Sequence, residues 1–261
     1  MLIQEISEAA RAAGQIILEA HDISQVVKEK PGTANFVTAY DVRVQHYLQT
    51  RLGEILPGAH FIGEEEDCTD DTAHGYAFIV DPIDGTTNFI RDYRASCVSI
   101  ALAKGGEVIT GVVYDPYRDE LFTAERGQGA ALNGKPIHVA DNPLSRSLFG
   151  VGTTSYYRSK ADGTFALARA LFDVSLDLRR SGSFAIDACA VACGRLDLAF
   201  EMRLSPWDYA ASSCILREAG GAMSQLDGSD ITLEHPCSIV CGSETAYREF
   251  FERGFDRIVQ D

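Results

Sequence analysis

A short apolar run between two acidic clusters constrains this chain more than any other feature. Residues 76–80, Tyr-Ala-Phe-Ile-Val, are apolar and β-prone, which predicts a buried strand. Glu64 to Glu66 precede this run, and Asp81 and Asp84 follow it at its carboxyl end. Carboxylates gathered at a strand end repel one another unless a cation lies among them, and oxygen ligands suit Mg²⁺ or a similar hard cation. The run therefore predicts a strand that carries a metal site at its end.

The composition is that of a folded chain with a large core. The chain has 261 residues, 46% of them hydrophobic, which is enough for two lobes that share one core. Its net charge of −15 makes nucleic acid and anionic membranes poor partners for the bulk surface. No apolar run approaches the length of a membrane span, and the first residues lack the features of a signal peptide. We therefore expect no nucleic-acid and no membrane partner.

The seven cysteines give no sign of a metal or disulfide framework. Their number is odd, their spacings are scattered, and no C-x-x-C pair occurs. A zinc knuckle and a thioredoxin-like motif are therefore not supported. The pattern indicates reduced, mostly buried thiols in a cytoplasmic protein.

The first half of the chain changes from helical to strand periodicity. Apolar spacing predicts helices over 3–21 and 41–56, joined by a loop that contains Lys28 and Lys30. Short links such as Gly105-Gly106 then predict strands joined as antiparallel hairpins. The expected strands are 59–63, 76–81, 97–104, 108–115, 119–125 and 129–132, and a short helix is expected to begin at Thr86.

The second half alternates helices with short strands, which predicts a mixed α/β lobe. The pattern changes near residues 140–146, so we place two lobes at 1–143 and 144–261. The expected helices are 160–173, 183–193, 208–219 and 243–258, and the expected strands are 174–178, 196–201, 222–226 and 237–242.

Taken one at a time, the acidic residues have structural explanations. Asp208 follows Trp207 at the start of a predicted helix, where an N-cap is the simplest interpretation. Asp84, Gly85 and Thr86 fit a turn with a capping threonine. These explanations leave Asp81, directly after a buried strand, without a role.

Four segments together resemble the inositol monophosphatase family, in the family's order and over nearly the whole chain. They are Val37 to Asp41, Gly63-Glu64-Glu65, Asp81 to Phe89, and Trp207 to Ala211. The resemblance implies a layered αβαβα sandwich, with an N-terminal antiparallel sheet and helices and a C-terminal mixed α/β lobe. It also implies Mg²⁺-dependent hydrolysis of a phosphate monoester by a metal-activated water.

The resemblance assigns roles to individual residues. Two to three Mg²⁺ ions would be held by Glu64, Asp81, the carbonyl of Ile83, Asp84 and Asp208, with Asp81 shared between two ions. Asp41 and Thr86 would lie near the attacking water, so the catalytic residues implied are Glu64, Asp41 and Thr86. Glu65 would orient a ligand or water. Lys30 would attract phosphate, although a solvated loop lysine is an equal alternative.

The substrate residues implied by the resemblance lie on both lobes. Asp84 and Glu201 would bind sugar or polyol hydroxyls, and the N–H groups of Gly85 and Thr86 would hold phosphate oxygens. Ser183 and Phe184 belong to the substrate loop. Phe184 stands where close relatives usually have a small residue, so its ring would narrow the pocket or stack on a flatter substrate.

The sequence leaves the substrate and one other role open. Inositol monophosphate is the substrate that the resemblance favours. Histidinol phosphate, fructose 1,6-bisphosphate and 3′-phosphoadenosine 5′-phosphate are the alternatives, and Thr87 argues against the last because that branch usually has lysine there. Gln45 replaces an acid that is common on the second helix. A regulatory protein-binding role is the alternative from another class. Lithium inhibition and a homodimer are further implications of the resemblance.

Overall fold

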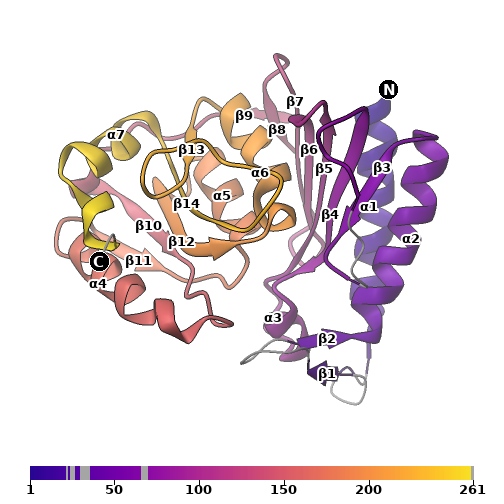
Figure 1. Ribbon diagram of the computed structural model, residues 1–261, viewed down its shortest axis with the longest axis horizontal. Coiled ribbons are helices and arrows are strands. Elements are labelled where there is room, and N and C mark those ends of the chain that lie inside the picture. The colour runs from indigo at the N-terminus through magenta and orange to yellow at the C-terminus, as the bar shows by residue number, and fades with distance from the viewer. Residues whose placement is uncertain (22, 24–26, 30–35, 66–69, 260–261) are drawn as a thin grey trace.

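Helix layers and sheets alternate across the molecule in the order α/β/α/β/α (Figure 1). The computed structural model describes residues 1–21, 23, 27–29, 36–65 and 70–259, so Lys30 and Cys68 lie outside the described residues. A seven-stranded and a five-stranded sheet enclose one central helix layer, and two outer helix layers cover their other faces. The predicted layered αβαβα sandwich is confirmed.

The first half of the chain builds the seven-stranded sheet and its outer helices. Helices α1 (Leu2–Leu18) and α2 (Ala39–Ile55) pack on one face of this sheet. Neighbouring strands are antiparallel except β3 and β4, which are parallel. In sheet order the strands are β3 (His60–Gly63), β4 (Tyr76–Asp84), β5 (Cys97–Lys104), β6 (Glu107–Asp115), β7 (Glu120–Glu125), β8 (Ala130–Leu132) and β9 (Lys135–Ile137). The short helix α3 (Thr86–Ile90) follows β4, as predicted.

The second half supplies the central helices and the five-stranded sheet. Helices α5 (Phe184–Ala192) and α6 (Pro206–Glu218) lie between the two sheets. Helices α4 (Ala161–Phe172) and α7 (Glu244–Glu252) cover the outer face. The strands in sheet order are β11 (Asp177–Arg179), β10 (Leu148–Val151), β12 (Leu198–Leu204), β14 (Cys237–Gly242) and β13 (Ala222–Ser224). Parallel pairing of β10 with β11 and β12, and antiparallel pairing of β14 with β12 and β13, make it a mixed sheet.

The two faces of the seven-stranded sheet pack against different helices. Successive residues of a strand point to opposite faces, so Phe78 and Val80 of β4 pack under α1 and α2. Ala77 and Ile79 belong instead to the core that contains α5 and α6. Small residues on this inner face allow α6 to approach the sheet closely, and α6 carries the remaining acidic candidate, Asp208.

Some short strands were not predicted. The expected loop around Lys28 contains β1 (Val27–Glu29), which pairs antiparallel with β2 (Phe36–Thr38). Strands β9 and β10 were also missed, because they are three and four residues long and contain Pro136 and Gly150. Pairing with neighbouring strands, rather than local propensity, selects such segments.

Two expected boundaries shift. The strand expected over 174–178 is observed as β11 three residues later, where it pairs with β10. The helix expected over 243–258 ends with α7, because Gly254 adopts a left-handed conformation with φ of 75°. A 3₁₀ turn, Phe255–Val259, follows.

The described part of the chain bears on two other expectations. The six cysteines that it contains are all free, and five of them are buried. None of its helices has both the length and the apolar content needed to cross a membrane. The division into lobes at residues 143 and 144 stays a prediction.

The close contact between α6 and β6 requires glycine at position 111 of β6. A Cβ added at Gly111 would overlap with the carbonyl oxygen of Ala211 on α6. We expect Gly111→Ala to lower the free energy of unfolding by about 2–3 kcal/mol, because the backbone of α6 must shift. Gly53→Ala is the matched control: its Cβ would meet no atom within 4 Å, so the same change on α2 would be neutral or stabilising. Equal effects in denaturant unfolding would contradict the close approach.

Candidate active site

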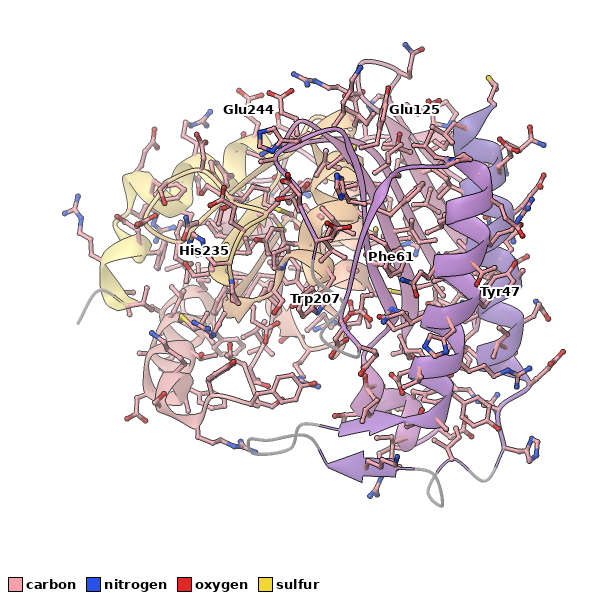
Figure 2. All side chains as sticks on the ribbon, turned by 45° about the vertical axis from the view of Figure 1, so that its right-hand side comes forward. Tyr47, Phe61, Glu125, Trp207, His235 and Glu244 are labelled. Carbon is pink, nitrogen blue, oxygen red and sulfur yellow. The ribbon has the colours of Figure 1, made fainter. Side chains whose placement is uncertain are left out.

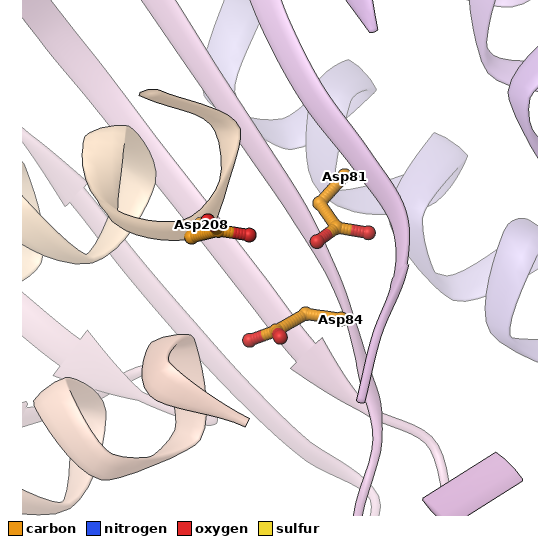
Figure 3. Close-up of side chains that lie close together, drawn as sticks. All are labelled: Asp81, Asp84 and Asp208. Carbon is orange, nitrogen blue, oxygen red and sulfur yellow. The ribbon is translucent and has the colours of Figure 1, made fainter. Parts of the chain in front are cut away.

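Three carboxylates from the two halves of the chain meet at one point. Asp81 and Asp84 come from the end of β4 and Asp208 from the first turn of α6, and Figure 3 shows the three side chains pointing toward one another. One carboxylate oxygen from each lies within 4.8 Å of the other two. All three line a cavity of about 500 Å³. The structure therefore confirms that these predicted ligands are neighbours.

A local irregularity of β4 brings two of them together. Residues three apart on a regular strand point to opposite faces. Pairing with β5 shifts register between Asp81 and Asp84, and Pro82 lies inside this bulge. The bulge turns both side chains toward the cavity, and β4 consequently extends to residue 84 rather than ending at the predicted 81.

Asp208 is not the N-cap that its sequence context suggested. Ser205 is the N-cap of α6, and Pro206 occupies the first helical position. Asp208 lies at the third position and accepts a hydrogen bond from the Ser205 N–H at 2.6 Å. Ser99 of β5 also donates to the carbonyl oxygen of Trp207 at 3.2 Å, which ties this turn to the sheet. Figure 2 shows Trp207 between the two halves of the molecule.

The other two carboxylates are also held by protein donors. The Ile83 N–H donates to Asp81 at 3.0 Å. Asp84 accepts from the Ser183 hydroxyl at 2.6 Å and from the Ala185 N–H at 2.9 Å, both at the start of α5. Asp84 thus links β4 to α5 across the central layer. Each carboxylate has one oxygen that is fixed by the protein.

The electrostatics of this cluster are unfavourable without a cation. Burial, and then the carboxylate of Glu64, raise the pKa of Asp81 well above its ordinary range. Burial also raises the pKa of Asp208, with Asp84 as the next cause. Burial raises the pKa of Asp84 to about 6, opposed in part by the Ser183 hydroxyl. Within the described residues, no lysine or arginine lies within ion-pair distance of the three. An oxygen-only donor set of this kind fits a hard divalent cation.

Glu64 and Glu65 are positioned from α2. Glu64 follows β3 and lines the same cavity as the three aspartates. Gln45 on α2 donates to the Glu65 carbonyl at 2.7 Å and accepts from the Glu65 N–H at 2.9 Å. A carboxylate at position 45 could accept from the Glu65 N–H but has no N–H to donate to the Glu65 carbonyl oxygen, so the amide of Gln45 is suited to make both hydrogen bonds. Glu65 is buried, as a supporting residue would be, and Lys30 lies outside the described residues.

Asp41, Thr86 and Ile83 form a second small network. The Thr86 hydroxyl lies 3.3 Å from Asp41 and 3.2 Å from the Ile83 carbonyl oxygen, and its one proton serves only one of them at a time. Asp41 caps α2 with Thr38, whose N–H donates to it at 2.8 Å. Burial raises the pKa of Asp41 to about 6, with hydrogen bonds from Thr38 opposing the shift.

The predicted substrate residues line the far side of the cavity. Gly85, Thr86, Ser183, Phe184 and Glu201 all contribute to its wall. Gly85 has a φ of 90°, and a Cβ there would approach the Ala95 carbonyl oxygen to 2.9 Å, so glycine is required. Phe184 is only 4% exposed because its ring packs into the central apolar core. Little of that ring is available to stack on a substrate.

Sequence patterns did not reveal the loop after β10. Thr154 donates its N–H to Glu201 at 2.7 Å. Tyr156 lines the cavity, where burial and then the carboxylates of Glu64 and Asp208 raise its pKa, so that its hydroxyl stays protonated. This loop matches no motif, and only the tertiary fold brings it to the acidic cluster.

Comparisons with known proteins agree with this arrangement. The model of the inositol monophosphatase family matches residues 2–258. The chain belongs to this family. It is 41% identical over 238 residues to inositol monophosphatase 1 of Solanum lycopersicum, covering 87% of this chain and 85% of the relative. It is 36% identical over 225 residues to Nus factor SuhB of Xylella fastidiosa, covering 85% and 81%. The solved inositol monophosphatase of Anabaena matches with a TM-score of 0.83 at 31% identity, covering 98% of this chain and 94% of that one.

Membership in the inositol monophosphatase family makes the chain a phosphoric monoester hydrolase of that type. The four segments that resemble the family converge on one cavity in the structure. Glu64, Asp81, Asp84, Thr86 and Asp208 line it directly, and Asp41 reaches it through Thr86. The family acts on small phosphate esters, and the acidic cluster is suited to a metal.

A buried acid on the cavity wall predicts how stability depends on pH. Burial raises the pKa of Asp187 on α5 to about 8, opposed in part by the Ser181 side chain. The folded protein therefore keeps a proton that the unfolded chain, with the ordinary value near 3.8, has released. The free energy of unfolding then falls as pH rises from about 4 to about 8.

Asp187→Asn removes this titration, so we expect the unfolding free energy of the variant to fall less than that of the wild type between pH 5 and pH 8. The two falls should differ by more than about 1 kcal/mol. Denaturant unfolding with a chelator present would measure it. Asp177→Asn is the control, because that carboxylate is exposed and pairs with Arg179. Parallel pH curves for wild type and Asp187→Asn would show that the assignment is wrong.

Proposed function

We propose that this protein hydrolyses the phosphate monoester of a polyol or sugar in a Mg²⁺-dependent reaction. The observation that carries the proposal is the convergence of Asp81, Asp84 and Asp208 within 4.8 Å in a cavity large enough for a small sugar phosphate. Inositol monophosphate is the substrate that the named relatives support. Histidinol phosphate, fructose 1,6-bisphosphate and 3′-phosphoadenosine 5′-phosphate are the alternatives.

The residues divide the chemistry between them. Glu64, Asp81, the Ile83 carbonyl, Asp84 and Asp208 would hold two to three Mg²⁺ ions. When bound, Mg²⁺ supplies a water of lowered pKa and neutralises charge on the phosphate and the leaving oxygen. Thr86 would orient the attacking water. Asp41, with a pKa of about 6, is ionised at neutral pH and can accept a proton through the Thr86 hydroxyl.

The remaining groups would bind the ester. The N–H groups of Gly85 and Thr86 would hold phosphate oxygens, and Ser183 keeps Asp84 in place beside them. Glu201, fixed by the Thr154 N–H, would accept hydroxyls of the leaving group. Phe184 would shape the wall from within the core, and Glu65 would support Glu64.

Further properties belong to the same proposal. A cytoplasmic location fits the free cysteines of the described residues. A homodimer would cover apolar surface such as Phe165 and Leu176, which are both 62% exposed. Lithium inhibition would follow from the cation site. The matched relatives named Nus factor SuhB favour a second candidate, a regulatory role through a protein partner.

The proposal predicts that Asp81→Asn abolishes turnover. Phosphate release from inositol 1-phosphate and the three alternatives, with and without Mg²⁺, would measure it. We expect turnover to fall by about three orders of magnitude or more, because a shared ligand of the cations is lost. Stability in a chelator should stay equal or rise, since a buried charge and its repulsion are removed.

Asp92→Asn is the matched control, because this exposed aspartate pairs with Arg94 near the site without lining the cavity. It should retain wild-type turnover. Near wild-type turnover in Asp81→Asn at saturating Mg²⁺ would overturn the assignment. If no ester were hydrolysed while a protein partner were retained by Asp81→Asn, the regulatory role would replace catalysis.

A further inference from the structure

Three arginines share the cavity wall contributed by the second half of the chain with three acidic residues. Arg158, Arg180 and Arg203 line the cavity that also holds Asp81 and Asp208. They come from three separate places: the turn after Tyr157, the segment after β11, and β12. Three guanidinium groups on one wall are unexpected in a protein with 38 acidic and 23 basic residues.

These arginines have no carboxylate partner of their own. Among the described residues, none of the three lies within 4.0 Å of a carboxylate oxygen, whereas the adjacent Arg179 pairs with Asp177 at 2.6 Å. Arg195 likewise pairs with Glu120 at 2.6 Å outside this cavity. The fold therefore neutralises neighbouring arginines and leaves those of the cavity wall available.

Arg203 is held in place with an unsatisfied donor. Its guanidinium lies over the ring of Tyr157, 4.7 Å from the centroid. Its Nε is buried and has no hydrogen-bond partner in the described structure. Arg180 is oriented by donation to the Thr153 hydroxyl at 3.2 Å. A planar guanidinium group whose position is fixed in this way is suited to bind two oxygens of a phosphate or carboxylate.

Two acidic groups lie on the same wall, and the charge of Arg180 lowers the pKa of both against the larger effect of burial. Glu201 and Asp187 also line it, and burial raises the pKa of Glu201 to about 7 and that of Asp187 to about 8. The wall thus combines two acids, of which Glu201 already accepts a hydrogen bond from the Thr154 N–H, with three arginines that form no ion pair within 4.0 Å in the described part of the chain.

We infer that this wall recognises a second anionic group, a phosphate or a carboxylate, on the leaving group of the ester. The inference rests on the proposed hydrolysis: the phosphate to be cleaved lies at the acidic cluster, and the second anion contacts Arg158, Arg180 and Arg203. A neutral cyclitol leaves those donors unmatched. A cationic leaving group, such as that of histidinol phosphate, is repelled.

Matched ester pairs test this selectivity. Fructose 6-phosphate and fructose 1,6-bisphosphate differ by one phosphate, and glycerol 1-phosphate and 3-phosphoglycerate differ by one carboxylate. We expect kcat/KM with Mg²⁺ to be about tenfold higher or more for the doubly anionic member of at least one pair. The pair that responds identifies which anion fits the wall. Raising the ionic strength from about 0.05 M to about 0.3 M should shrink the ratio, since the interaction is screened.

Arg203→Gln and Arg158→Gln should each lower the ratio of the two kcat/KM values by about tenfold, while Arg179→Gln leaves it unchanged. Arg158 is exposed, so its replacement tests the inference even if Arg203→Gln folds poorly. Phosphate release at equal kcat/KM within both pairs, or a ratio unaffected by both cavity variants, would overturn the inference alone. No release from any of these esters, nor from inositol 1-phosphate assayed beside them, would overturn the proposed function and the inference with it.

Discussion

Repulsion among buried carboxylates opposes the packing at the centre of this molecule. Asp81 is 1% exposed and Asp84 is 7% exposed, yet their nearest charged neighbours, Asp208 and Glu64, are also acidic. Each carboxylate has one oxygen fixed by a backbone N–H or a hydroxyl, which offsets only part of the cost of burial. The second half of the chain must nevertheless bring Asp208 to the end of β4. A bound divalent cation would remove this conflict and would couple folding to metal binding at this point.

Close packing of the central helix layer brings Asp208 to the end of β4. Gly111 and several alanines on the inner face of the seven-stranded sheet let α6 lie close enough to place Asp208 opposite the bulge of β4. Helix α5 contributes Ser183 and the Ala185 N–H to Asp84. The acidic cluster is thus held by elements from both sides of the core. The same convergence leaves the opposite wall to be formed by β12 and by the segments that follow β10 and β11, where the three arginines lie.

Much of this arrangement could be predicted from local sequence. Apolar, β-prone segments joined by short turns identified β4 to β8, and helical patterns identified α1, α2, α4, α5 and α6. The acids after Val80 indicated a cation site because carboxylates gathered at a strand end repel one another. The bulge between Asp81 and Asp84 and the clamp of Gln45 on Glu65 were not predicted, since both depend on pairing with distant residues. The arginines of the cavity wall were missed for the same reason: Arg158, Arg180 and Arg203 belong to no shared motif and meet only in the folded chain.

We infer that Asp81, Asp84 and Asp208 are held together in the folded protein to bind a divalent cation. The decisive measurement is thermal unfolding of wild type, Asp81→Asn and Asp208→Asn over a range of Mg²⁺ concentrations, at ionic strength kept constant with NaCl. We expect the unfolding temperature of the wild type to rise with Mg²⁺, since the ion would bind only the folded state, and each variant to lose most of that rise. An unfolding temperature independent of Mg²⁺ in the wild type, or an equal rise in both variants, would contradict it.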